Sequence, residues 1–150
     1  MAGIDIVHVP YKGSAPSGQD LMGGQIMLGF DSIIQNLPHI KNGRLKAIAV
    51  LGSERSAVLP EVPTVHESGV PGYDLTNWFA LVVPVATPAD AATRIAVDVG
   101  KVLALPDVRE RIAAMGATPV GNSPQQFGAF MRAESDKWAK LIAEAGIQAQ

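Results

Sequence analysis

The first half of the chain alternates short apolar runs with helix-compatible and polar segments. Three runs rich in branched apolar side chains are typical of buried strands and cover residues 4–9, 25–30 and 45–50. A helical segment over residues 15–22 separates the first two runs. A short helical turn over residues 33–37 and a polar turn over residues 39–43 separate the next two. This order predicts a parallel α/β sheet built from βαβ units.

The pattern changes after residue 50. Pro and Gly recur through residues 52–73, which we expect to form a surface excursion with one short helix near residues 65–68. A fourth strand is predicted over residues 78–84. Beyond it the apolar positions recur at helical spacing and predict three helices.

Local signals mark the ends of these three helices. Thr87 is expected to cap the first, whose apolar stripe runs to Leu105, and Gly116 is expected to close the second. A capping box from Ser123 to Gln126 opens the third, which ends at Gly146. Its apolar stripe, which includes Trp138, is expected to face a core. A sheet usually has about five or six strands, and this sequence predicts three buried ones. We therefore expect the sequence to be a fragment.

Composition narrows the functional classes. The 150 residues are 47% hydrophobic, which is enough for one globular domain with a real core. A net charge of −2 and 5% aromatic residues argue against a nucleic-acid partner. The absence of Cys excludes disulfides and thiolate chemistry. No apolar run approaches the roughly 20 residues of a membrane span, and the N-terminus has neither the basic region nor the cleavage site of a signal peptide.

The most informative loop is the HVPYKGSAP stretch, which runs from the first predicted strand into the first helix. We expect Ser14 to cap this helix, whose free N–H groups and positive dipole end favour an anion. Lys12 and the hydroxyl of Tyr11 lie beside this helix start. A carboxylate or a phosphate suits such a position. Many similar loops bind no ligand, and for this loop alone that alternative stays open.

A second loop, at Asp31 and Ser32, follows the next predicted strand. The carboxyl ends of parallel strands meet at one edge of a sheet, so both loops are expected at that edge. Asp31 either caps the turn that follows or accepts a hydrogen bond from an amine or hydroxyl of a ligand.

Residues suited to catalysis or metal binding do not form a convincing group. His8, His39 and His66 are far apart in the sequence, which argues against a metal site. The chain has no nucleophile elbow, phosphate-binding loop or dinucleotide fingerprint. An enzyme that uses Asp31 as a base and Lys12 as a Schiff-base lysine is the weaker alternative, since an exposed lysine keeps its proton. We therefore predict binding without catalytic residues, cofactor or metal.

Several blocks of the sequence resemble the C-terminal half of the tripartite tricarboxylate transporter substrate-binding proteins, the Bug family of periplasmic receptors. The similar blocks are HVPYKGSAP, DLMGGQIMLGFDS, RLKAIAV, LGSERSAVLPEVPTVHESGVPGY, NWFALVVPVATP, LPDVRERIAAMGATPVG and the final SPQQF…ESDKWAKLIAEAGI. The resemblance implies an α/β, periplasmic binding protein type II-like fold, in which two domains close on a small carboxylate. It implies no cofactor, no metal and no catalysis.

The resemblance also implies how the chain is divided. Residues 1–83 resemble the ligand-binding second domain without its first strand and helix. Residues 84–150 resemble the crossover and the C-terminal helices of a mostly missing first domain. The residues that it places at the ligand are Pro10, Tyr11, Lys12, Gly13, Ser14 and Ala15 in one loop, with Phe30, Asp31 and Ser32 at the neighbouring strand end.

Two hypotheses follow from these observations. The first is a truncated solute receptor that binds a small organic carboxylate, whether a di- or tricarboxylate, an amino acid or an aromatic acid. Its full-length form would work in the periplasm with the membrane subunits of a transporter. The alternative is a non-binding interaction module, in which the apolar faces of residues 89–105 and 124–145 pair between copies as a homodimer or a domain swap.

Overall fold

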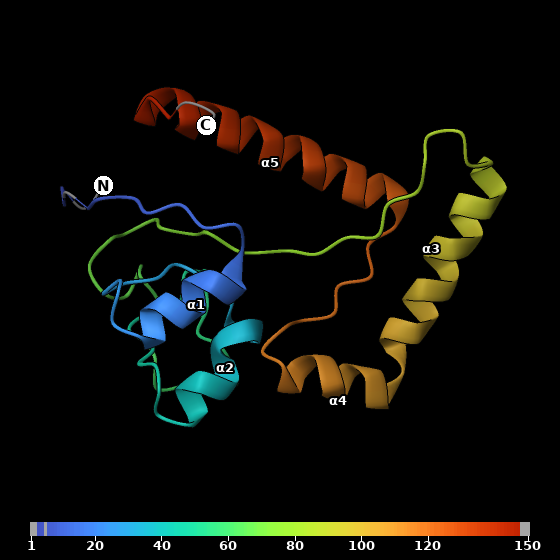
Figure 1. The fold of residues 1–150 in the computed structure, drawn as a ribbon. Helices are drawn as coiled ribbons and strands as arrows, with labels where there is room; N and C mark the ends of the chain where they lie inside the picture. The colour runs from blue at the N-terminus through green and yellow to red at the C-terminus, as the bar shows by residue number, and fades with distance from the viewer. Residues whose placement is uncertain (1–2, 5, 148–150) are drawn as a thin grey trace. The chain divides into compact units, whose positions relative to one another are not determined.

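The computed structural model describes residues 3–4 and 6–147. This part of the chain contains helices α1 (Ser14–Met22), α2 (Ile33–Lys41), α3 (Ala89–Ala104), α4 (Pro106–Ala114) and α5 (Pro124–Ala145), as Figure 1 shows. The chain forms two compact units. Unit 1 contains the residues up to Leu81 together with Glu110–Thr118, and unit 2 contains Val82–Arg109 and the residues from Pro119 onward.

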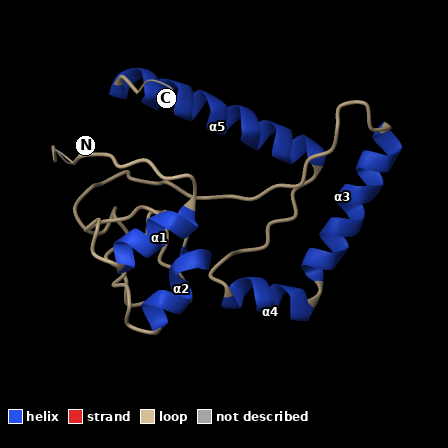
Figure 2. Ribbon diagram, in the orientation of Figure 1, coloured by secondary structure: helices blue, strands red, loops and turns tan. Residues whose placement is uncertain are grey.

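The predicted strands do not form ladders among the described residues. Residues 25–30, 45–50, 78–84 and the described part of 4–9, which leaves out residue 5, are drawn as loops in Figure 2. One parallel bridge joins Val50 to Thr64, where the Val50 N–H donates to the Pro63 carbonyl (2.8 Å) and the Val65 N–H donates to the Val50 carbonyl (2.9 Å). A strand exists only where a neighbour takes its backbone groups, and most of these segments have no such neighbour in the described chain.

The small core of unit 1 uses a segment that we predicted to lie at the surface. Leu37 of α2 is buried with Leu59 and Val62, and Thr64 beside them is 1% exposed. Gly116, just after α4, has a φ of +82°, and a Cβ there would approach Ile33 Cγ2 to 2.8 Å. The surface-excursion prediction for residues 52–73 is therefore wrong in its central part, because Leu59 and Val62 cover the apolar face of α2.

The sizeable core predicted from composition is not found in the described residues. Val7 is 89% exposed and Met27 is 90% exposed. Helices α3 and α5 contain no buried residue, although α5 was expected to turn an apolar stripe to a core. Trp138 on α5 is half-buried, and its Nε1–H donates to Glu134 Oε2 over 3.0 Å. Apolar content alone does not make a core, since each apolar face needs a second surface.

Helix ends that depend on local sequence form as predicted. The Ser123 Oγ accepts from the Gln126 N–H, the Gln126 side chain accepts from the Ser123 N–H, and Gly146 ends α5 in the left-handed conformation. Thr87 does not cap α3, which begins at Ala89 with Pro88 before it and no side-chain cap.

Two further helix predictions differ from the structure. Helix α2 continues through Pro38 to Lys41, where a polar turn was predicted, because Leu37 and Ile40 both pack at the core. Residues 65–68 form turns instead of a short helix. Within residues 3–4 and 6–147, no helix is both long enough and apolar enough to cross a membrane.

Glu67 is hydrogen-bonded to Arg55 and Thr64, which lie on either side of the core residues Leu59 and Val62 in the sequence. The Arg55 Nε–H donates to Glu67 Oε2 (2.9 Å) and Oε1 (3.1 Å), and the Thr64 N–H donates to Glu67 Oε2 (2.8 Å). The Glu67 N–H in turn donates to Thr64 Oγ1 (3.1 Å). The bond from Arg55, followed by that from Thr64, lowers the pKa of Glu67 below its ordinary value of 4.5.

Acid is therefore expected to weaken unit 1 through Glu67. A carboxyl group with a lowered pKa in the folded state stabilises that state above pH 4.5, and the contribution is lost as the pH falls through the folded pKa. Urea unfolding followed by circular dichroism should show a midpoint that falls from neutral pH to about pH 3. The midpoint should fall less in Glu67→Gln than in wild type. Glu61→Gln, a control at an exposed carboxylate, should behave as wild type, and identical pH profiles for all three would contradict the assignment.

Candidate functional site

Two loops of unit 1 are joined by a hydrogen bond between Ser14 and Asp31. The Ser14 hydroxyl donates to Asp31 Oδ1 over 2.7 Å, across 17 residues of sequence. The same oxygen accepts from the Ser32 N–H, also at 2.7 Å. The structure thus brings together the loops that were expected at one edge. We call residues 10–15 and 30–32 the two-loop site, and their role in ligand binding stays a prediction.

The start of α1 differs from the expected serine cap. Its N-cap residue is Gly13, no side chain caps the helix, and the Ser14 hydroxyl is directed to Asp31 instead. Gly13 has φ 128° and ψ 175°, a region that only glycine enters readily. A Cβ at Gly13 would meet nothing within 4 Å, so backbone conformation and not space calls for glycine. The first N–H groups of α1 consequently have no side-chain acceptor from a capping residue.

Tyr11 and Lys12 have different surroundings in the first loop. The Tyr11 hydroxyl donates to Asp20 Oδ2 over 2.7 Å, which ties the loop to the second half of α1. This hydrogen bond is the main reason that the pKa of Tyr11 is raised. Lys12 is exposed, and among the described residues no ion pair or hydrogen bond involves its side chain. The lysine is therefore the available cation of this loop, while the tyrosine hydroxyl is already engaged.

The remaining residues of the two-loop site are mostly accessible. Pro10 and Ala15 are exposed, and the Phe30 side chain is 63% exposed. Asp31 is half-buried, and Ser32, not Asp31, is the N-cap residue of α2. The Ser32 carbonyl accepts from Asn36 Nδ2 over 3.1 Å.

Sequence reasoning missed two side chains that hold these loops. Asn36 is one, and its place four residues after Ser32 in the first turns of a helix is a usable signal. Asp20 is the other, and it lies nine residues from its partner Tyr11. No local pattern indicates a pair at that distance, so Asp20 was not predictable from the motif alone.

An open groove of about 650 Å³ leads along unit 1 to the two-loop site. Its walls are the segments of residues 6–9 and 25–31, and Tyr11, Gly13 and Ser14 also line it. The two segments carry mostly apolar side chains, but polar atoms line the groove about as much as apolar atoms do, and Ser14 and Asp31 are among its polar lining residues. The groove is therefore a mixed polar and apolar surface beside the two-loop site.

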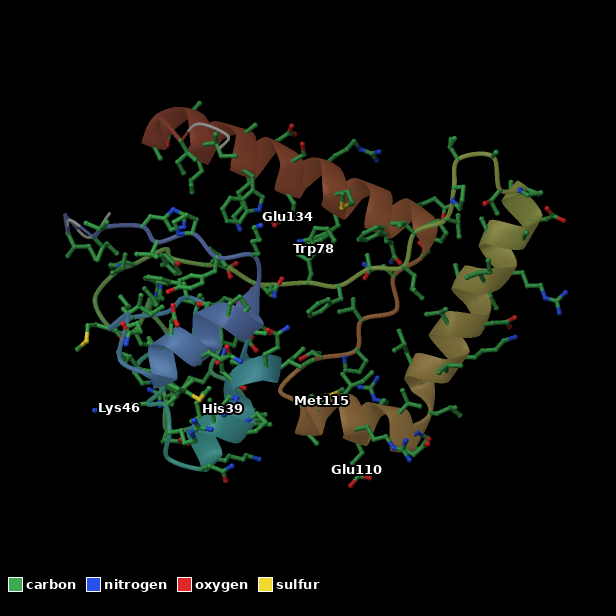
Figure 3. The ribbon with its side chains drawn as sticks, viewed as in Figure 1. His39, Lys46, Trp78, Glu110, Met115 and Glu134 are labelled. Atoms are coloured by element: carbon green, nitrogen blue, oxygen red, sulfur yellow. The ribbon has the colours of Figure 1, made fainter. Side chains whose placement is uncertain are left out.

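Two of the three histidines, His39 and His66, lie outside the residues that line the groove, whereas His8 is one of them. His39 lies on α2, and Lys46 lies on the loop that follows α2 (Figure 3). His66 Nδ1 accepts from the Gly72 N–H over 2.9 Å, which is a structural role in a turn. In the part of the chain that the structure describes, no three or more His, Asp or Glu side chains are grouped to hold a metal ion.

Comparisons with known proteins agree on one family. The sequence profile of the tripartite tricarboxylate transporter family receptors matches residues 1–147. BugT of Bordetella pertussis is 37% identical over 146 residues, which are 97% of this chain and 45% of BugT.

Solved structures give the same result. R. palustris Rpa4515, solved with adipate, is 35% identical with a TM-score of 0.93, over 98% of this chain and 49% of that one. The periplasmic binding protein BugD is 32% identical with a TM-score of 0.89, over 99% of this chain and 50% of BugD. These similarities confirm the predicted fold class. The chain spans about half the length of these proteins.

Replacement of Gly13 tests the backbone that supports the site. Gly13→Ala is expected to lower the free energy of unfolding by about 1–3 kcal/mol, because a Cβ is strained at a φ of 128°. Gly100→Ala is the matched control inside α3, where nothing lies within 4 Å and alanine should stabilise by about 0.5–1 kcal/mol. Denaturant unfolding measures both variants. A Gly13→Ala protein as stable as wild type would contradict the strained conformation.

Proposed function

The chain belongs to the tripartite tricarboxylate transporter receptor family, and from this premise we propose that it forms one part of a solute receptor for small carboxylates. Receptors of this family bind solutes and are not enzymes, in line with the expectation of binding without catalysis. The observation that carries the proposal is the hydrogen bond between Ser14 and Asp31, which holds the two loops together at the end of a groove. The presence of adipate with Rpa4515 supports a carboxylate as the ligand.

The donors for a carboxylate in this site are Lys12 and the start of α1. The Lys12 ammonium is exposed, and the N–H groups of Ser14 and Ala15 come at the helix end that favours anions. Pro16 has no N–H, so these two residues supply the backbone donors of the first turn. One cation and two aligned N–H groups match the charge and geometry of a single carboxylate group.

Ser14 and Asp31 serve a positioning role in this proposal. The hydrogen of the Ser14 hydroxyl is engaged with Asp31 Oδ1, so the hydroxyl does not donate to a ligand in this arrangement. The ionised Asp31 would repel a carboxylate in direct contact, and its free lone pairs suit an amine or hydroxyl of a ligand. The pair thus fixes the loop that carries Lys12, and the carboxylate of the ligand is bound by the Lys12 ammonium and the first N–H groups of α1.

We assign the two parts of the chain to two domains of the receptor. Residues 1–83 are proposed as part of the ligand-binding second domain, and residues 84–150 as the crossover and C-terminal helices of the first. The change from unit 1 to unit 2 at Leu81 and Val82 supports a boundary there, although Glu110–Thr118 groups with unit 1. The opposite wall of the ligand site is assigned to the receptor sequence that this chain does not match. Such a receptor would act in the periplasm and deliver its ligand to transporter membrane subunits.

Calorimetry with organic acids tests the ligand class. Adipate, malate and citrate are titrated into the chain, alone and after addition of the part of Rpa4515 that it does not match. At least one acid should bind, and Lys12→Ala should raise its Kd on the order of tenfold through loss of a charged contact. Lys46→Ala, the control at an exposed lysine outside the two-loop site, should bind as wild type. No heat for any acid in either format would refute the proposal.

Self-association is the second candidate function, and the accessible apolar side chains of unit 2 favour it. Ile95 of α3 is 43% exposed and Ile142 of α5 is 44% exposed. Exposed apolar stripes of this kind are uncommon in monomers.

Light scattering distinguishes the self-association candidate. If the chain self-associates, the wild-type protein should have the mass of two chains at high concentration. Ile142→Glu places a charge in the apolar stripe and should have the mass of one chain. Arg94→Glu, the control at an exposed site, should keep the mass of two chains. A wild-type monomer at all concentrations would exclude this function and leave the receptor proposal intact.

A further inference from the structure

The segment of residues 32–53 carries positive formal charges and no acidic side chain. Its charges are those of Lys41, Arg44 and Lys46, while Asp31 precedes the segment and Glu54 follows it. The whole chain has a net charge of −2, so this part of unit 1 departs locally from the overall charge. We call the three cations the basic turn.

Backbone hydrogen bonds gather the basic turn at the end of α2. The N–H groups of Arg44 (2.9 Å) and Leu45 (3.2 Å) both donate to the His39 carbonyl, so the chain reverses just after the helix. Arg44 and the nearby Lys46 therefore return beside the helix end that carries Lys41. The three cations are close in space as well as in sequence.

The side chains of the basic turn are not neutralised by acidic neighbours. All three are exposed, and within residues 3–4 and 6–147 none of them takes part in an ion pair or a hydrogen bond. In unit 2, by contrast, Lys101 pairs with Asp98 over 3.0 Å. The dipole of α2 favours a cation in its last turn, but Arg44 and Lys46 lie beyond the helix and are not explained in this way.

The basic turn lies at the opposite end of α2 from the two-loop site. Ser32 of that site is the N-cap residue of α2, and Asn42 is its C-cap residue. The nine residues of the helix place about 13 Å between these two ends, at 1.5 Å for each residue. A partner on the basic turn therefore does not need to touch the two-loop site.

The chemistry of the basic turn favours a surface that presents many anionic groups. Residues 41–44 are Lys, Asn, Gly and Arg, all exposed, so this part of the turn has no apolar anchor of the kind that protein interfaces usually contain. Lysine ammonium groups act as compact point charges on flexible stems, which suits diffuse attraction better than the fixed geometry of a single small anion. Several cations near an anionic membrane surface each add to the attraction.

We propose that the basic turn binds the anionic headgroups of a phospholipid surface, by electrostatic attraction and without insertion into the bilayer. This contact would hold unit 1 against a membrane through the αβ turn that follows α2. It involves neither Lys12 nor the start of α1, and it needs no carboxylate ligand. The lipid proposal and the carboxylate proposal can therefore fail independently.

Co-sedimentation of the full chain with vesicles tests the proposal. Vesicles of phosphatidylcholine with phosphatidylglycerol should bind the chain, vesicles of phosphatidylcholine alone should not, and binding should be lost at about 1 M salt, where the screening length is about 3 Å. Equal binding to both vesicles, or binding that salt leaves unchanged, would assign the contact to the exposed apolar side chains and overturn the proposal. Binding to soluble polyglutamate without binding to the anionic vesicles would assign the turn to an acidic protein and also overturn it.

Paired variants show whether the basic turn or the net charge is responsible. The double variant Arg44→Gln, Lys46→Gln keeps Lys41 at the end of α2 and should bind anionic vesicles about 25-fold more weakly, at about fivefold for each cation removed. Lys101→Gln, Lys140→Gln removes the same charge from exposed sites of unit 2 and should bind as wild type. Circular dichroism checks that both variants keep the wild-type helix content. Unchanged binding in the first variant, or the same loss in both, would overturn the assignment to the basic turn.

Discussion

An extended apolar segment has two requirements at once, since its backbone needs hydrogen-bond partners and its side chains need cover. In the described part of this chain, the segments of residues 6–9 and 26–30 meet neither requirement, whereas Val50 meets the first through its bridge to Thr64. This constraint explains why unit 1 buries only a small cluster around Leu37 although the composition is rich in apolar residues. Within residues 3–4 and 6–147, the apolar segments of a parallel sheet are present without most of the backbone pairing that makes one.

The two-loop site depends on hydrogen bonds that cross from one βα loop to the next. Asp31 Oδ1 accepts from both Ser14 and Ser32, so one oxygen fixes the starts of α1 and α2. The Tyr11 hydroxyl, through Asp20, ties the first loop to the body of α1. Among the residues that the structure describes, these bonds leave the Lys12 ammonium and the first N–H groups of α1 as donors without partners. In a receptor for carboxylates, a fixed frame with free donors lowers the ordering cost of binding.

Sequence reasoning succeeded where the determining residues are neighbours and failed where they are not. The capping box at Ser123 and the end of α5 at Gly146 follow from residues three or four positions apart. The cap assigned to Ser14 was wrong because its hydroxyl finds Asp31, 17 residues away. The strand predictions identified apolar extended segments but not their pairing, which depends on a partner segment. That the two loops meet followed from the βαβ order. The role of Asp20 did not follow from any motif, whereas Asn36 had a usable signal in its place four residues after Ser32.

The role proposed for the two-loop site is to bind the carboxylate of a receptor's ligand. The most direct test of this role is to measure backbone amide NMR shifts of the labelled chain in complex with the part of Rpa4515 that the chain does not match. On titration with adipate, the amide shifts are expected to be largest at Lys12, Gly13, Ser14 and Ala15, with smaller shifts at Asp31 and Ser32. Shifts confined to other parts of unit 1 or to unit 2, with the two loops unchanged at saturation, would contradict it.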